Sequence, residues 1–290
     1  MNLRQIEFTL AVAEEASFTR AAEKCHTVQS ALSHQVARLE DELGVALFER
    51  TSRHVRLTAA GEAFVRQAHV AWEAVRRISE EVAAVTGQVQ GSLSIGAISA
   101  LGDIDIVALI AGFHARHPQV DIQLSQSGSE ELLAQLRQAR LDIALVGLWR
   151  GEQIEGLEHL LLTQERLVAL LPPTHAWRAS EHLTLERLAT LPLVDYPRGS
   201  SARLQTDKAF DAAGVRHQVR FEVNHLDLIV QFVSRGLAAG LVPQSVATRL
   251  QGVTPIAVQD APERVLYAVW ARSPSPAASA FITSLQAGSH

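Results

Sequence analysis

A short stretch of the chain gathers hydrogen-bonding and cationic side chains at helical spacing. Gln29, Ser30, Ser33 and His34 fall on one side of a predicted helix, and Arg38 lies about one turn further along. Amide, hydroxyl, imidazole and guanidinium groups form hydrogen bonds with base edges in a DNA major groove and with backbone phosphates. The other side of the same helix is apolar, so we expect the helix to pack on that side and to present the polar one. The apolar residues are Leu32, Val36, Leu39 and Leu43.

A basic turn follows this helix. Segments 45–47 and 55–57 alternate apolar and polar residues, which predicts a two-stranded hairpin with its turn at 51–54. No acidic residue follows Glu49 around the tip, so positive charge is concentrated there. Clustered guanidinium groups suit contact with phosphates or with a minor groove. The basic residues of the hairpin are Arg50, Arg53, His54 and Arg56.

The composition leaves a nucleic-acid partner open and excludes several other classes of protein. The 290 residues carry a formal charge of −5. Residues 1–66 hold eight Lys and Arg against nine acidic residues, so any contact with DNA depends on where the charges lie. A hydrophobic share of 47% with 20% charged residues is typical of a globular chain. One cysteine excludes a disulfide framework and a cysteine metal cluster. We expect no metal, no cofactor and no catalytic residue.

The sequence also predicts where the protein resides. Its N-terminal stretch carries acidic residues among the apolar ones, unlike a secretory signal. No run approaches the ~18 consecutive apolar residues of a membrane span. A single cysteine fits a reducing compartment. We therefore expect a soluble cytoplasmic protein with no membrane partner.

Three helices and the hairpin are expected to position the polar face. The apolar spacing predicts a first helix that ends near Glu15. Ser17 can cap a second helix, and Gly44 ends the third because glycine readily adopts the left-handed conformation found there. Three helices followed by a basic hairpin form a winged helix-turn-helix. We place this domain at residues 1–58, with the helix-turn-helix at about 18–37.

Several motifs follow one another in this region. They are Phe18-Thr19-Arg20-Ala21-Ala22, Gln29-Ser30-Ala31-Leu32-Ser33-His34-Gln35-Val36, Leu47-Phe48-Glu49-Arg50 and Leu57-Thr58-Ala60-Gly61. Together they closely resemble the LysR-type transcriptional regulators over residues 1 to about 65. That family usually has an apolar residue followed by Ser or Thr before the glutamine, whereas this chain has Thr27-Val28. A phosphate contact or helix cap from a hydroxyl must therefore come from Thr27 or be absent.

The predicted DNA contacts combine the helix face with the hairpin. We assign the polar face to bases or backbone in the major groove, and the hairpin arginines to phosphates or a minor groove. Cys25 stands where the family usually has leucine, and a buried structural thiol is favoured over a redox sensor because no second cysteine exists to resolve it. The complete set is Arg20, Thr27, Gln29, Ser30, Ser33, His34, Arg38, Arg50, Arg53 and Arg56.

A long helix is predicted at 59–88. Thr58 can cap it, and no glycine or proline interrupts it between Gly61 and Gly87. Its apolar residues alternate at spacings of three and four over three heptads, which is typical of a coiled coil, although packing onto its own domain is the alternative. Dimerisation would place two reading helices about one DNA turn apart, ~34 Å, and favour a partly palindromic site. The family resemblance further implies a tetramer. The seam comprises Gly61, Phe64, Ala68, Ala71, Val75, Ile78, Val82 and Val85.

The C-terminal two thirds change to alternating strands and helices. A first series predicts strands at 93–97, 120–124 and 142–147, with helices at 101–116 and 132–136 between them. This order predicts a mostly parallel sheet. A second series follows, with strands at 166–171, 193–195, 219–223 and 237–242 and helices at 183–188, 202–213 and 226–235.

Two such series predict two α/β lobes joined by crossing segments. This arrangement resembles the periplasmic binding proteins, and the LysR resemblance implies it for an effector-binding domain. The predicted fold class is therefore α/β overall, with a winged helix-turn-helix, a long linker helix and a two-lobed effector domain at 91–290. We place lobe 1 at about 91–162 plus 267–290 and lobe 2 at about 163–266.

Ligands of such sheets bind outside the carboxyl ends of the strands, where loops from both lobes meet. Hydroxyls, helix N-terminal amides and one arginine in those loops suit a small anion such as a carboxylate. A plain helix cap is the alternative role for each residue, and Asp103 in the first loop weakens the case for a simple anion. The predicted effector contacts are Ser99, Ala100, Ser127, Ser129, Tyr196, Arg198, Ser200, Asn224 and His225.

These observations predict a sequence-specific DNA-binding transcription regulator controlled by a small-molecule effector. The expected partners are double-stranded DNA, the effector and further copies of the chain. The alternative is a cytoplasmic small-molecule-binding protein or enzyme with an incidental helical N-terminal domain. A gel-shift assay with the DNA upstream of the protein's own gene separates the two.

Overall fold

The computed structural model describes residues 1–50, 54–177 and 182–288. The chain divides into two compact units, which are described separately. The first comprises residues 1–88 with 138–140, and the second comprises residues 89–137 with 141–290. None of the described helices has the length and apolarity that crossing a bilayer requires.

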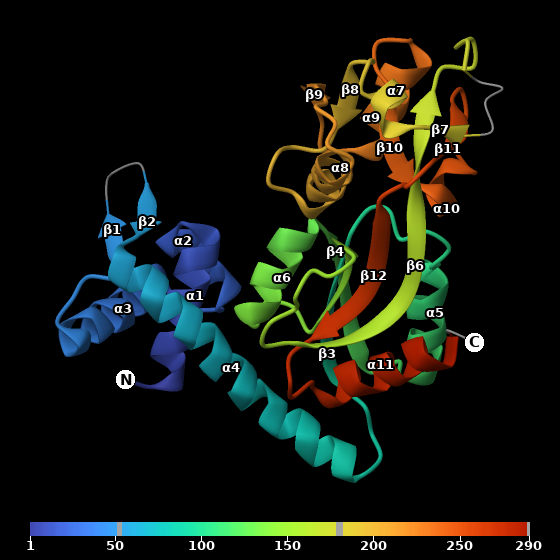
Figure 1. Cartoon of the computed structure of the whole chain (residues 1–290). Coiled ribbons are helices and arrows are strands. Elements are labelled where there is room, and N and C mark those ends of the chain that lie inside the picture. Colours follow the sequence, from blue (N-terminus) through green and yellow to red (C-terminus); the bar gives the residue numbers. More distant parts are fainter. Residues whose placement is uncertain (51–53, 178–181, 289–290) are drawn as a thin grey trace. The chain divides into compact units, whose positions relative to one another are not determined.

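The first unit begins with three helices (Figure 1): α1 at Leu3–Glu15, α2 at Phe18–Lys24 and α3 at Gln29–Leu43. As predicted, Ser17 caps α2 by accepting a hydrogen bond from the backbone N–H of Arg20, and Gly44 ends α3 at a φ of 69°. Ala21 and Ala22 are buried, and small side chains at these positions let α2 pack closely against its neighbours. The core of the unit holds Phe8, Val12, Leu32, Val36 and Leu39.

The hairpin starts later than the sequence predicts. Strand β1 (Phe48–Arg50) pairs antiparallel with β2 (Val55–Leu57). The prediction of a strand at 45–47 is wrong, because pairing with β2 begins only at Phe48. The backbone N–H groups of Leu47 and Phe48 donate to the Glu40 carboxylate at 2.8 and 3.1 Å. Residues 51–53 of the turn lie outside the described residues.

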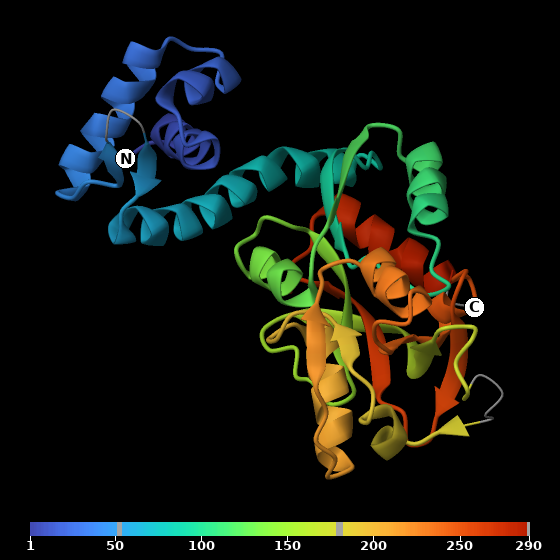
Figure 2. The ribbon, with the colours of Figure 1, turned by 90° about the horizontal axis from the view of Figure 1, so that it is seen from above.

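Helix α4 (Ala59–Val85) is continuous, as Figure 2 shows. Thr58 caps it, since its hydroxyl accepts from the backbone N–H of Gly61 at 3.0 Å. Its first half packs on α1 through Val65 and Ala68. Its second half carries apolar side chains at the surface of the chain, with Ile78 63%, Val82 66% and Val85 88% exposed. The two halves of the helix therefore have different surroundings.

The second unit begins with the predicted strand–helix alternation. Strand β3 pairs in parallel with both β4 and β5. The helix expected from residue 101 begins only at Ile106, because Asp105 caps it by accepting from the N–H of Ala108 at 2.9 Å. The elements are β3 (Gly91–Ala97), α5 (Ile106–Arg116), β4 (Val120–Gln126), α6 (Ser129–Arg137) and β5 (Ile143–Trp149).

Two long strands connect the halves of this unit. Strand β6 (Glu158–Leu171) and strand β12 (Glu263–Trp270) pair antiparallel, and β12 is also antiparallel to β5 (Figure 1). The three strands of the first series pair in parallel, as predicted, but the crossing strands run antiparallel to them and make the whole sheet mixed. Along the sheet the order is β4-β3-β5-β12-β6, followed by β11 (Thr254–Val258) and β7 (His182–Leu183), and β10 (Gly240–Pro243) pairs with β6 off this path.

The other half of the unit holds shorter elements. The helix predicted at 183–188 is only α7 (Leu185–Leu188), because residues 182–183 form a strand that pairs with β11. The strand predicted at 237–242 starts at Gly240. The remaining elements are β7 (His182–Leu183), β8 (Leu193–Asp195), α8 (Ser201–Ala212), β9 (Val219–Glu222), α9 (Leu226–Ser234), β10 (Gly240–Pro243), α10 (Gln244–Ala247), β11 (Thr254–Val258) and α11 (Pro276–Gly288).

Separate apolar clusters stabilise the two halves. In one, Phe113 of α5 contacts Phe281 of α11 edge to face, with ring centroids 5.3 Å apart. In the other, Phe210 of α8 packs among side chains of β6, β10 and β11. A sheet that is continuous between two independent cores explains how the unit forms two lobes joined by β6 and β12.

Candidate functional site

The polar face of α3 lies at the surface of the first unit. Gln29, Ser30, His34 and Arg38 are exposed, and Ser33 is half-buried. The apolar stripe on the other side is buried at Leu32, Val36 and Leu39, whereas Leu43 is 43% exposed. The helix therefore presents four exposed polar side chains, with Ser33 partly covered beside them.

The start of α3 departs from the usual capped form. Its cap residue is Val28, which is 66% exposed and supplies no side-chain hydrogen bond. The first turn contains no acidic residue. Backbone N–H groups at a helix start attract anions such as phosphate. Thr27 is half-buried beside this turn.

The other cations of the first unit differ in their surroundings. Arg20 is exposed, but its guanidinium pairs with Glu15 at 3.2 Å and also donates to the Glu15 carbonyl. Arg56 is exposed on β2, directly across the hairpin from Glu49. The side chain of Arg50 and all of Arg53 lie outside the described residues.

The second unit contains a cavity of about 450 Å³ between its lobes. The loops after β3, β4, β8 and β9 line it. Of the predicted effector contacts, Ser99, Ala100, Ser127, Ser129, Tyr196, Ser200, Asn224 and His225 line this cavity.

Arg198, also predicted as an effector contact, does not line the cavity. Residues 197–200 form a tight turn closed by a hydrogen bond from the Ser200 N–H to the Pro197 carbonyl at 3.2 Å. Gly199 adopts a φ of 93° within the turn, and Arg198 is exposed. The turn leaves Arg198 at the surface.

Two of the lining hydroxyls already have partners within the protein. Ser129 donates to the carbonyl of Gly147 and accepts from its N–H, both at 3.1 Å. Ser200 caps α8 by accepting from the N–H of Arg203, and it donates to the Pro197 carbonyl at 2.8 Å. The helix-cap alternative therefore describes the hydroxyl of Ser200, whereas that of Ser129 joins α6 to the backbone of β5.

A buried ion pair stands beside the cavity. Arg264 of β12 lines it and pairs with Glu165 of β6 at 2.6 Å, with side chains 6% and 11% exposed. Burial raises the pKa of Glu165, but hydrogen bonds from Ser245 and Arg264 outweigh it and leave the pKa below its usual value. Burial lowers the pKa of Arg264, against the effect of Glu165.

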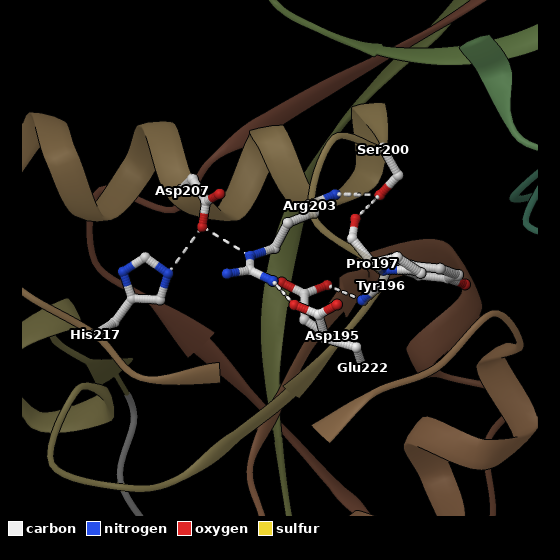
Figure 3. Close-up of polar contacts among 8 residues, drawn as sticks. All are labelled: Asp195, Tyr196, Pro197, Ser200, Arg203, Asp207, His217 and Glu222. Atoms are coloured by element: carbon white, nitrogen blue, oxygen red, sulfur yellow. Dashed lines mark hydrogen bonds and ion pairs between the residues drawn. The ribbon is translucent and has the colours of Figure 1, made fainter. Parts of the chain in front are cut away.

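A second network of charged side chains lies next to Asp195 (Figure 3). Arg203 of α8 is buried and pairs with Asp207 at 2.8 Å and Glu222 at 3.2 Å, and His217 reaches Asp207 at 2.9 Å. Asp195 lines the cavity and accepts from the N–H of Tyr196 at 2.7 Å. Burial raises the pKa of Asp195 to about 7.

Contacts across the cavity join the two lobes. Glu130 of α6 accepts a hydrogen bond from the backbone N–H of Ser201, the first residue of α8. Gln205 of α8 donates to the Gly147 carbonyl of β5 at 3.4 Å. Both Glu130 and Gln205 line the cavity. Among the residues that the structure describes, no group of three or more His, Cys, Asp or Glu could hold a metal ion.

Family models match both units. One, described as a bacterial regulatory helix-turn-helix protein of the lysR family, matches residues 3–62. Another, described as the LysR substrate binding domain, matches residues 86–289. The chain belongs to the LysR family. It is a DNA-binding transcription regulator with an effector-binding domain, as the sequence predicted.

Individual relatives agree with this assignment. The hydrogen peroxide-inducible genes activator of Pectobacterium carotovorum subsp. carotovorum is 32% identical over 243 residues, covering 84% of this chain and 80% of the relative. A structure of a full-length OxyR variant from Pseudomonas aeruginosa is 30% identical with a TM-score of 0.78, covering 99% and 95%. CbnR complexed with its target DNA is 24% identical with a TM-score of 0.70 over all of both chains, which shows the shared fold.

The sequence missed several cavity residues of this LysR-family protein. Arg264 lies on β12, which was not predicted as a strand, and its partner Glu165 lies on β6 upstream of the predicted strand start. Gln205 lies within a predicted helix and Glu130 just before the helix predicted at 132–136, but their part in the cavity depends on how α8 and α6 face one another across it. Glu165 and Arg264 lie directly opposite each other in the pairing of β6 with β12. Their contact can therefore be recognised only once these two strands are known to pair.

Proposed function

We propose that this LysR-family protein binds a partly palindromic DNA operator as a homodimer or tetramer. A small molecule held between the lobes of the second unit controls that binding by favouring one arrangement of the assembly over another. The observation that supports this most is the exposed polar face of α3, which begins at an N-terminus with no side-chain cap or acidic residue.

The DNA contacts are divided between the helix and the hairpin. Gln29, Ser30, Ser33 and His34 contact bases or backbone in the major groove, with Thr27 and Arg38 beside them. Arg50, Arg53 and Arg56 contact phosphates or the minor groove. Arg20 would have to exchange its pairing with Glu15 for a phosphate, so we expect its contribution to be smaller than that of Arg56.

Helix α4 is the dimerisation element. Its apolar seam is covered by its own domain at Gly61 and Ala68 but is exposed at Ile78, Val82 and Val85. A seam with three- and four-residue spacing is stable when it packs against a second helix. A second copy of the chain supplies that helix, and two weak DNA contacts held together act as one strong contact.

The proposed domain boundaries are those predicted from the sequence, and they fall close to the ends of the helices and strands described above. We assign 1–58 to the DNA-binding domain, 59–88 to the linker and 91–290 to the effector domain. The lobe boundaries near 162 and 266 lie beside the register shift between Leu266 and Tyr267 of β12. We assign the protein to the cytoplasm and give it no catalytic activity.

A disulfide bond within one chain does not sense the regulatory signal of this protein. Relatives are named hydrogen peroxide-inducible genes activators, but Cys25 is the one cysteine of this sequence. Burial raises the pKa of the Cys25 thiol, which lowers its fraction of reactive thiolate. The effector therefore acts through the cavity.

A DNA-binding titration tests the proposal. The DNA upstream of the protein's own gene is titrated with full-length protein, its His34→Ala and Arg53→Ala variants, and Arg272→Ala in the second unit as a control. We expect His34→Ala to lower the affinity for the operator at least tenfold and the affinity for unrelated DNA by less. Arg53→Ala should weaken binding to all sequences and lower the salt slope by about one. Equal losses on both DNAs for His34→Ala, or an unchanged salt slope for Arg53→Ala, would contradict the contacts assigned here.

A further inference from the structure

We propose, on the basis of the effector-binding function above, that the cavity selects a small molecule that carries no negative charge and offers N–H or O–H donors. Glu130 is the residue that enforces this selectivity. The proposal rests on the charges of the lining residues and on which of their polar groups are already bonded within the protein.

The cation of the cavity is already neutralised. Of the titratable residues described in its lining, Arg264 is the one that is permanently positive. Its guanidinium pairs with Glu165 at 2.6 Å, and Glu165 is held in place by the N–H of Ser245 at 3.1 Å and by the Ser245 hydroxyl. The pair uses Nη2 of Arg264 and leaves the buried Nε without a partner, but Glu165 already cancels the charge of the guanidinium, so a carboxylate effector would add an uncompensated negative charge. The titratable lining residues are Glu130, Asp195, Tyr196, His225 and Arg264.

The helix start that an anion would use is also occupied. Helix α8 is twelve residues long and begins at the cavity. The backbone N–H of its first residue, Ser201, donates to the carboxylate of Glu130 from the opposite lobe. An anionic ligand favours such a helix N-terminus. In this protein a side chain of its own supplies the anion.

Apart from His225, the remaining lining is neutral or acidic. The hydroxyls of Ser129 and Ser200 are engaged within the protein. Asp195 adds a second carboxyl group to that of Glu130. Uncharged polar side chains complete the polar lining, and apolar ones form the rest of the wall, which suits a small neutral or cationic molecule. These are Ser99, Gln126, Ser127, Gln205 and Asn224, with Ile98, Ala100, Leu167, Leu241 and Pro243.

A charge-changing substitution isolates the effect of Glu130. Glu130→Gln keeps an oxygen that can accept from the Ser201 N–H but removes the negative charge. Glu131 is the adjacent residue on α6; it is exposed, bonds to Gln135 and does not line the cavity. Glu131→Gln is therefore a control that removes the same charge next to the site.

The experiment uses sets of three compounds that share one carbon skeleton and end in an amide, an amine or a carboxylate. Binding to full-length protein is measured by thermal shift and calorimetry for the wild type and both variants. We expect the amide or amine member of each binding set to bind the wild type more tightly than the carboxylate. Glu130→Gln should raise the relative affinity for the carboxylate about tenfold, and Glu131→Gln should leave it unchanged.

Three results would overturn the proposal. They are tighter binding of the carboxylate members to the wild type, an unchanged ratio in Glu130→Gln, and no binding of any member to the wild type. The same preparations are assayed for operator binding. If the wild type binds its operator but prefers carboxylates, the proposed ligand class alone is contradicted. If the wild type does not bind the operator, the proposed function itself is contradicted.

Discussion

Single side chains decide which charges this protein can bury. Arg264 and Glu165 are both largely enclosed, and they pair at 2.6 Å between the two crossing strands. Removing one partner of a buried pair leaves the other charge desolvated and uncompensated, which costs far more than losing a pair at the surface. The pair therefore stabilises the junction of the lobes only while both members are present.

We expect Glu165→Gln to lower the free energy of unfolding of the second unit by about 3 kcal/mol. Chemical denaturation followed by circular dichroism measures this change. Glu158→Gln is the matched control, because Glu158 lies on the same strand in an exposed pair with Arg272 at 4.0 Å. Its cost should stay below about 1 kcal/mol. Equal costs for the two variants would show that the Arg264 pair is not effectively buried.

Asp195 makes stability depend on pH in a defined direction. Burial raises its pKa to about 7 in the folded protein, whereas an unfolded aspartate titrates near 4. The folded state therefore holds an extra proton between these values, and stability falls as pH rises from about 4 to about 7, then levels off. The slope is at most about 1.4 kcal/mol per pH unit.

Replacing Asp195 with asparagine should remove that slope. Its amide oxygen can still accept from the Tyr196 N–H, but no proton is exchanged. Unfolding is measured at pH 5.5 and pH 8 for the wild type, for Asp195→Asn and for Asp211→Asn on the exposed side of α8. We expect the pH difference to shrink in Asp195→Asn and to persist in Asp211→Asn. A full difference in Asp195→Asn would assign the titration to other groups.

At the scale of elements, the sequence predicts local structure well and long-range pairing poorly. The helices of the first unit begin and end where Ser17, Thr58 and Gly44 indicate, because caps and left-handed turns are encoded locally. Strand β12 was missed, and it determines the direction of the central sheet. Its residues are buried on both faces, so the apolar run shows no alternation from which a strand or its direction could be predicted.

The candidate site follows the same division. Loop residues after predicted strands could be placed at the cavity because the carboxyl ends of neighbouring parallel strands lie together. The sequence could not show that Arg198 lies outside the cavity lining, since the position of its side chain depends on the turn at 197–200. Arg264 could not be found, since its partner Glu165 is about a hundred residues away along the chain and adjacent only through the pairing of β6 with β12.

The exposed half of the apolar seam on α4 leads to a prediction about self-association. A charge in the exposed half of its seam should weaken pairing with a second helix without disturbing the half that packs on α1. We expect Val82→Glu to shift the protein toward single chains in sedimentation velocity, because burying an unpaired carboxylate is costly. Glu81→Gln, an exposed neighbour outside the seam, is the control. An unchanged assembly in Val82→Glu would place the dimer contact elsewhere.

At the scale of the whole molecule, the features that serve regulation are divided between two compact units. The first unit carries the polar face of α3 and the basic hairpin, and the second carries the cavity between two lobes. A formal charge of −5 makes the chain as a whole a poor polyanion binder. Strong and specific binding to DNA therefore requires the contacts of more than one copy.

The most direct test of this account is the stoichiometry of the protein on its operator. Analytical ultracentrifugation with labelled operator DNA is carried out for the wild type and Val82→Glu across protein concentrations. We predict that the wild type occupies the operator as two or four chains, and that Val82→Glu loses at least tenfold in affinity as it dissociates. Full-affinity occupancy of the operator by single chains would contradict the account.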